Sequence, residues 1–452
     1  MISTRFITIL SISCILTILL GSSGSVLAKR PKPPPEPEPV PVPVGTTEIV
    51  SLASDGSPGN GNSHSQDMTP EGRYVVFSSS SSNLVPGDTN AESDIFVHDR
   101  TTGIIERISV ASDGTQADDW SYGASISEDG RYVAFYSYAN NLVPGEQTYF
   151  SQVYVHDRVN GVTERVSIST DGTLANASSS YTAINADGRY VAFSSSADNL
   201  VQGDTNGYRA DIFVRDRLNS TTERISVASD GSEANHRSGL PSISADGLTL
   251  AFLSDASNLV AGDTNNATDI FVHNRVTRTT ERVSVASNGT QGNDWSGGPD
   301  LSADGRVVVF SSTASNLVSG DTNNYFDVFV HDRNNATTER ISVNYDGSQL
   351  NDDSYSGSLS ADGRYVTYLT YASSLDIGVV FWWWYSDIFV YDRVTGTTEI
   401  VSLSSDGVQG DNDSNSPLIS GDGRFVVFDS YATVLVPGGT GRNDVYIRDR
   451  NP

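Results

Sequence analysis

The chain has 452 residues, a formal net charge of −27 at pH 7 and a single cysteine. A chain this acidic repels nucleic acid, so we expect no nucleic-acid partner. One cysteine excludes a disulfide framework and a thiolate metal site within the chain. Cations or basic partners are the ligands that this charge favours.

The first 45 residues predict export followed by a spacer. Arg5 precedes an apolar run over residues 7–20, and small residues end at Ala28, which is typical of a secretory signal peptide over residues 1–28. The apolar run is too short for a membrane span. Residues 29–45 alternate proline with other residues and predict an extended linker. We therefore expect an extracytoplasmic protein, periplasmic or secreted, with no membrane span in the mature chain.

Residues 46–452 consist of a repeat of about 58 residues that occurs seven times. Within one unit, residues 73–77, 94–98 and 106–110 are rich in β-branched and aromatic residues, and a shorter strand-like run precedes each Asp-Gly anchor. Apolar residues occur at both parities, so both faces of each small sheet require burial. The seven anchors are Gly72, Gly130, Gly188, Gly247, Gly305, Gly363 and Gly423. The pattern predicts an all-β, seven-bladed β-propeller of four-stranded blades.

The two ends of the repeat region predict how the ring closes. Internal units end with a run such as TTERVSV at residues 279–285, but the seventh unit stops after residues 444–450 and lacks this run. The missing copy, TTEIVSL, stands at residues 46–52, ahead of the first complete unit. We expect this N-terminal strand to complete the last blade, because closure removes exposed sheet edges.

The segments SEDGRYVAF at residues 127–135 and VYVHDR at residues 153–158 resemble the TolB-like, WD-repeat-like propeller repeat. The resemblance covers essentially the whole repeat region. It implies a β-propeller, and members of the family act as periplasmic interaction platforms or as parts of hydrolases and lyases. The chain departs from TolB itself in having a proline spacer instead of a separate N-terminal domain. Its loop between the second and third strands is also longer than the family's usual turn.

In three units that loop carries oxygen side chains at positions 1, 3 and 7, and the loop of the third unit has the same residue types but is one residue longer. This is a partial match to the ligand pattern of a calcium loop. The alternative is that Asp and Asn cap a turn by hydrogen bonds to the backbone. The candidate Ca²⁺ ligands are Asp88, Asn90 and Asp94, then Asp204, Asn206 and Asp211, then Asp263, Asn265 and Asp269, and finally Asp321, Asn323 and Asp327.

Aromatic residues mark a second candidate site. The sixth unit replaces the polar loop by an aromatic insertion, and exposed aromatic clusters are typical of contact surfaces. The alternative is a plug folded over the channel or a neighbouring blade. The candidate partner-binding residues are Phe381, Trp382, Trp383, Trp384 and Tyr385, with Trp120 and Trp295 on the same face.

Catalysis receives less support from the sequence. Four of the six histidines occupy one repeated strand position, and only His64 and His236 lie outside it. We therefore predict a non-catalytic binding scaffold, not an enzyme, that binds a protein or polysaccharide through an acidic loop face that carries the candidate calcium ligands. The alternative is a polysaccharide-active lyase or hydrolase that uses carboxylates at the channel mouth. Fold alone does not choose between them.

Overall fold

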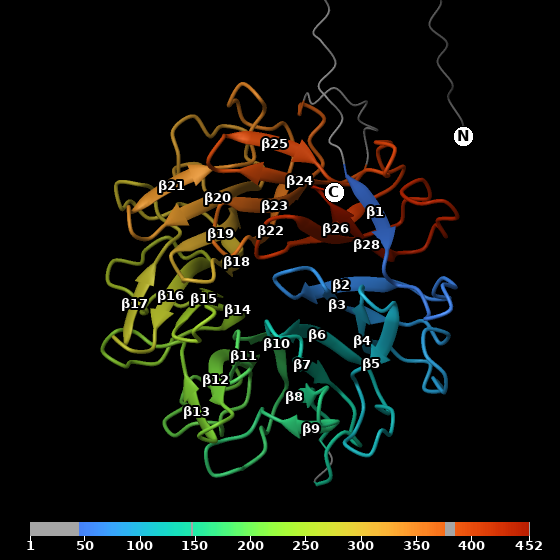
Figure 1. Cartoon of the computed structure of the whole chain (residues 1–452). Helices are drawn as coiled ribbons and strands as arrows, with labels where there is room; N and C mark the ends of the chain where they lie inside the picture. The colour runs from blue at the N-terminus through green and yellow to red at the C-terminus, as the bar shows by residue number, and fades with distance from the viewer. Residues whose placement is uncertain (1–44, 146–147, 376–384, 452) are drawn as a thin grey trace, which may run out of the picture. The chain divides into compact units, whose positions relative to one another are not determined.

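The computed structural model describes residues 45–145, 148–375 and 385–451, and every regular element within these ranges is a β-strand. The strands form seven antiparallel four-stranded sheets arranged as the blades of a ring (Figure 1). The predicted all-β, seven-bladed propeller is confirmed. The predicted signal peptide and residues 29–44 of the predicted linker lie outside the described residues. Among the described residues, no helix is long and apolar enough to cross a membrane.

Blades are numbered in chain order, and each is given from its innermost to its outermost strand. Blade 1 contains β2 (Ser63–Met68), β3 (Tyr74–Ser79), β4 (Asp94–Asp99) and β5 (Ile104–Arg107). Blade 2 contains β6 (Ser121–Ile126), β7 (Tyr132–Ser137), β8 (Gln152–Asp157) and β9 (Val162–Arg165). Blade 3 contains β10 (Ser179–Ile184), β11 (Tyr190–Ser195), β12 (Asp211–Asp216) and β13 (Thr221–Arg224). Blade 4 contains β14 (Ser238–Ile243), β15 (Thr249–Ser254), β16 (Asp269–Asn274) and β17 (Thr279–Arg282).

The remaining three blades repeat this order. Blade 5 contains β18 (Ser296–Leu301), β19 (Val307–Ser312), β20 (Asp327–Asp332) and β21 (Thr337–Arg340). Blade 6 contains β22 (Ser354–Leu359), β23 (Tyr365–Thr370), β24 (Asp387–Asp392) and β25 (Thr397–Ile400). Blade 7 contains β26 (Ser414–Ile419), β27 (Phe425–Ser430), β28 (Asp444–Asp449) and β1 (Thr46–Ile49).

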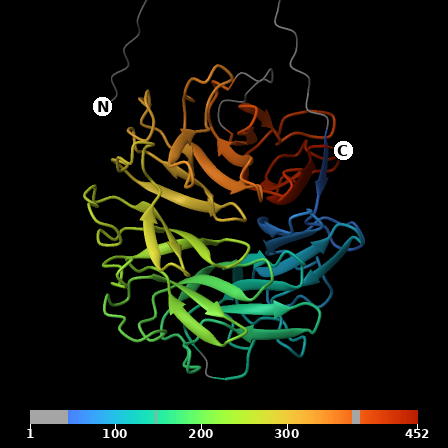
Figure 2. The same ribbon diagram turned by 60° about the vertical axis from the view of Figure 1, so that its left-hand side comes forward.

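The first strand of the chain closes the ring, as the sequence predicts. β1 pairs antiparallel with β28, with Thr46 opposite Asp449 and Ile49 opposite Tyr446. Figures 1 and 2 both show the blue first strand beside the red strands of the last blade. Without β1, the outer edge of β28 would expose unpaired backbone groups to solvent.

The core lies between the blades, where the second and third strands of one blade pack against the inner strands of the next. One such cluster contains Val76 and Val97 of blade 1 together with Ile126 and Phe135 of blade 2. Since blades pack on both sides, β3 and β4 bury residues of both parities. This explains why the strands read as continuous apolar runs.

An arginine after the third strand of each blade joins neighbouring blades. In blade 2 the Arg158 guanidinium donates to Glu106 of blade 1 at 2.9 Å and lies over the Tyr74 ring at 4.6 Å. It also donates to the carbonyl of Gly130 in its own blade. We call this set of contacts the seam, and it recurs around the ring. The seam arginines are Arg100, Arg158, Arg217, Arg275, Arg333, Arg393 and Arg450.

The seam requires a glycine where the ring of one blade meets the turn of the next. Gly188 has φ +72°, and a Cβ atom there would lie 2.3 Å from Cδ2 of Tyr132. Glycine adopts this left-handed conformation without steric cost, whereas other residues do not. Gly203 has a similar φ of +78° but no atom within 4 Å of the same hypothetical Cβ.

We expect Gly188→Ala to destabilise the propeller more than Gly203→Ala does. Both alanines carry the left-handed backbone cost of about 1 kcal/mol. Only Gly188→Ala adds overpacking against Tyr132, which costs about a further 1 to 3 kcal/mol. Thermal denaturation of both variants measures the difference, and equal losses would contradict the seam as a close-packed contact.

Candidate functional site on the loop face

The loop face carries the loops between second and third strands and the connections that lead into each next blade. These two kinds of segment are in contact. Nδ2 of Asn90 donates to the carbonyl of Ala117 at 2.9 Å, and Nδ2 of Asn265 donates to the carbonyl of Gly292 at 3.0 Å. The Asn side chain at position 3 of the loop therefore binds its own blade's connection.

The first and seventh positions of the predicted calcium loops share an arginine from the outermost strand. In blade 4, Nη1 of Arg282 lies 3.3 Å from Asp263 and 3.4 Å from Asp269, and all three side chains are buried. Blades 1 and 5 repeat this through Arg107 and Arg340. A glutamine supplements the arginine, since Nε2 of Gln291 donates to Asp263 at 2.8 Å. A guanidinium and an amide thus bind these carboxylates in blades 1 and 4, whereas in blade 5 Gln349 donates to Thr322 and only the guanidinium is shared. The calcium prediction for the loops of blades 1, 4 and 5 stays a prediction.

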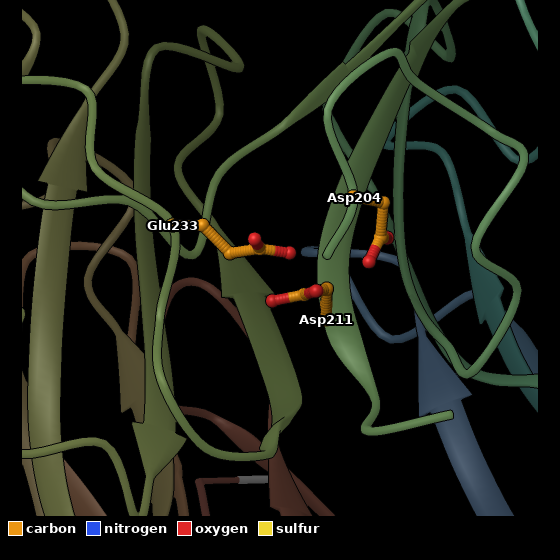
Figure 3. A group of neighbouring side chains, drawn as sticks. All are labelled: Asp204, Asp211 and Glu233. Atoms are coloured by element: carbon orange, nitrogen blue, oxygen red, sulfur yellow. The ribbon is translucent and has the colours of Figure 1, made fainter. Parts of the chain in front are cut away.

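The third blade departs from this arrangement because Glu233 stands where blades 1, 4 and 5 have glutamine. Oxygen atoms of Asp204, Asp211 and Glu233 all lie within 4.8 Å of one another. Figure 3 shows the three carboxylates pointing toward a common centre. Burial, and then the charge of Asp211, raises the pKa of Asp204 to about 7. Burial also raises the pKa of Asp211 to about 6, against hydrogen bonds such as that from Ser226.

A pocket of about 620 Å³ opens over blade 4 on the loop face. It lies between the connection that enters blade 4, the ends of β15 and the following loop, and the connection that enters blade 5. Its lining residues are Asn235, His236, Arg237, Asp255, Ser257, Asn266, Ala267, Thr268, Asp294 and Trp295. The sequence predicts only Trp295 of these as a binding residue.

Asp255 organises this pocket. Nε of Arg237 donates to Asp255 at 2.5 Å, Oγ1 of Thr268 donates to it at 2.6 Å, and Nδ1 of His236 lies 3.5 Å from it. Burial alone raises the pKa of Asp255, but the hydrogen bonds from Thr268 and Arg237 outweigh burial and leave the pKa lowered. Asp255 is therefore ionised at neutral pH, and it orients a half-exposed imidazole and an exposed guanidinium side by side.

These pocket residues break the repeat. Arg237 precedes an innermost strand at the position that holds Trp120 in blade 2 and Trp295 in blade 5. Arg209, another arginine outside the repeated positions, donates to the carbonyl of Asn235 beside the pocket. An alignment of the seven units with each other would have identified these pocket residues. The seam and core positions repeat, whereas the residues just before each innermost strand vary.

The central channel holds a second cavity, of about 510 Å³, lined by the innermost strands. Burial raises the pKa of Asp67 in this lining to about 7. Asp67 accepts a hydrogen bond from the backbone N–H of Ile126 in the next blade, and Asp300 does the same with Leu359. Ser242 fills this role at the matching position of blade 4, where it accepts from Leu301. Asp67 and Asp300 thus join neighbouring blades. Neither residue belongs to a motif identified in the sequence.

The predicted aromatic site is only partly described. Phe381, Trp382, Trp383 and Trp384 lie outside the described residues, and Tyr385 is partly exposed. Trp120 is half exposed and contacts Tyr122 edge-on at 6.5 Å. Trp295 packs edge-on against Phe326 at 5.4 Å, which fixes its indole at the rim of the blade 4 pocket.

No family model and no curated protein sequence matches this chain. Among solved structures, an oligogalacturonate lyase in complex with manganese is similar, with a TM-score of 0.52, 12% identity, and coverage of 90% of this chain and 96% of that chain. A second oligogalacturonate lyase, from Vibrio parahaemolyticus, has a TM-score of 0.51, 14% identity, and coverage of 90% and 97%. TolB from Acinetobacter baumannii has a TM-score of 0.39, 17% identity, and coverage of 84% and 81%.

These comparisons correct our prediction of function. The predicted non-catalytic scaffold is not favoured over the lyase alternative, because two similar structures that match almost the whole chain are lyases. At such low identity the likeness establishes the propeller fold and nothing finer. The fold that the TolB-like resemblance implies is present, as a ring of seven four-stranded blades.

We expect Arg282→Met to destabilise the protein by about 3 to 5 kcal/mol, because it leaves two buried carboxylates, Asp263 and Asp269, without their cation. Burial already raises the pKa of Asp269. Protonation relieves the repulsion, so the loss should be larger at about pH 8 than at about pH 5. The exposed Arg278→Met serves as the control in thermal denaturation. A loss no larger than that of the control would contradict an ion-paired role for Arg282.

Proposed function

We propose that the propeller is an extracytoplasmic enzyme that cleaves an acidic polysaccharide, with the blade 4 pocket as its active site and elimination as its reaction. One observation carries the proposal. His236, Arg237 and Asp255 break the repeat and meet in one open pocket beside Trp295. In a chain of net charge −27, this gathering of an imidazole and a guanidinium fits an anionic ligand.

Each pocket residue has a chemical part in such a reaction. A lyase acting on a uronate chain needs a base for the proton at C5 and a positive group beside the C6 carboxylate. His236, oriented by Asp255, is the general base in this proposal. Arg237 pairs with the carboxylate, since a guanidinium recognises carboxylates bidentately. The Trp295 ring offers an apolar face for a sugar ring.

The elimination balances without a further reactant. His236 takes the C5 proton, and the electron pair of the broken C–H bond forms a C4=C5 double bond. The bond from C4 to the glycosidic oxygen breaks, and that oxygen takes a proton from solvent in the open pocket. Negative charge that develops on the uronate carboxylate during proton removal is stabilised by Arg237. The products are an unsaturated uronate at one new end and an ordinary hydroxyl at the other.

Two lines of support lie outside the pocket. Lyases named for oligogalacturonate share the fold over nearly the whole chain, so the scaffold is compatible with this chemistry. The predicted signal peptide over residues 1–28 would deliver the enzyme to the compartment in which such polymers occur. The polysaccharide partner is thus proposed for the loop face.

We expect the purified protein to cleave a uronate polymer, such as polygalacturonate, in preference to a neutral glucan. His236→Asn should lower kcat by about 10²- to 10⁴-fold, the usual contribution of a general base. Arg237→Gln should lower kcat/KM, because carboxylate pairing contributes to binding and to the transition state. The readouts are new reducing ends and the ultraviolet absorbance of the C4=C5 double bond.

Asn412→Ala is the matched control, because Asn412 occupies in blade 7 the repeat position that His236 occupies in blade 4. This variant should retain wild-type activity. Reducing ends without the double bond would identify a hydrolase and overturn elimination. Cleavage that survives both pocket variants would move the active site elsewhere, and a folded protein inactive on every acidic polymer would overturn the proposal as a whole.

A further inference from the structure

In blade 3, Glu233 replaces the glutamine of blades 1, 4 and 5. The buried carboxylate of Asp204 therefore lacks the amide donor that its counterparts in blades 1 and 4 have. In blades 1 and 4, Nε2 of Gln116 and of Gln291 donates to the first aspartate of the loop at 2.8 Å. Glu233 lacks the N–H donors of a glutamine amide, so this position no longer supplies an amide donor to Asp204. The Asp204 side chain is only 2% exposed, and its Oδ1 has no hydrogen-bond partner among the described residues. A buried acceptor without a partner is costly.

The net charge of this cluster also favours a cation. Arg224 is the guanidinium of this cluster, and its Nη1 lies 2.5 Å from Glu233, 3.5 Å from Asp204 and 3.7 Å from Asp211. Three carboxylates and one guanidinium leave two negative charges when all are ionised. The matching clusters of blades 1, 4 and 5 leave one, because they have two carboxylates. A divalent cation would neutralise the excess charge in blade 3.

We propose that blade 3 binds one hard divalent cation, of the calcium class, between Asp204, Asp211 and Glu233. The ligands are all oxygen atoms, which suits calcium, magnesium or manganese and disfavours softer metals. The three residues come from two segments, the loop that ends at β12 and the connection that follows β13. A cation would join these segments where blades 1 and 4 use a glutamine amide.

The site also adjoins the blade 4 pocket. Glu233 lies three residues before His236, and the blade 3 loop carries Arg209, which binds the carbonyl of Asn235. A bound cation would therefore hold the segment that supplies the imidazole. This consequence rests on the proposed function, whereas binding of the cation does not.

The test compares the chelator-treated wild type with Glu233→Gln and uses calcium, magnesium and manganese as probes. Calorimetry should give one calcium per wild-type chain and none for Glu233→Gln. Saturating calcium should raise the wild-type Tm by several degrees and leave the Tm of Glu233→Gln unchanged. Without metal, Glu233→Gln should have a higher Tm than the wild type, because the introduced amide can donate to Asp204 as Gln291 donates to Asp263.

Asp198→Asn is the control, because it removes one exposed charge from the same blade and should keep the calcium response of the wild type. Equal Tm increases with every cation in all three proteins would mean charge screening only and would overturn the site. Absence of calorimetric binding would also overturn it and would leave a proton shared between Asp204 and Glu233. Calcium binding without cleavage of uronate would keep the site and refute only the proposed activity.

Discussion

The seam arginine is the contact on which the ring depends. Each one pairs with a glutamate of the preceding blade, and in blades 1 to 4 and 7 it also lies over an aromatic ring of that blade. Its third partner is the carbonyl of its own blade's anchor glycine, so one guanidinium links two sheets. The same contact explains why closure needs the N-terminal strand, because Arg100 of blade 1 finds its glutamate, Glu48, only when β1 has joined blade 7.

A second arginine shows how tightly each blade's charges are matched. In six blades the arginine after the Asp-Gly turn pairs with the aspartate that ends the third strand, as Arg131 does with Asp157. Blade 4 has Leu248 and Asn274 at these two positions, so both charges are lost together. Losing only the arginine would leave a largely buried aspartate without its cation, which costs more than losing the pair. Blade 4 thus differs from the other blades at this end of its strands as well as on its loop face.

Because the seam and the core fix the scaffold, the loop face is free to vary. The residues just before each innermost strand contribute little to the core, and they include tryptophan, arginine, aspartate and serine. The candidate functional residues lie where two departures from the repeat are adjacent in the sequence. The glutamate of blade 3 and the His-Arg pair of blade 4 lie within five consecutive residues, Glu233 to Arg237. One short connection therefore supplies a carboxylate to the acidic cluster and both the imidazole and the guanidinium to the pocket.

The sequence alone determined the number of blades, their four strands and the closing strand, because a period of about 58 residues with buried positions of both parities leaves few other ways to bury the sheets. It also identified the loops between second and third strands, and Trp295, as candidate sites. It did not identify Arg282 as the partner of Asp263, or Asp255 as the residue that joins His236 to Arg237. These contacts lie within blade 4, where the pairing of β14 with β15 and of β16 with β17 brings together segments that are separated in the sequence. Local patterns record which residues are buried, whereas the pairing of strands decides which charges meet.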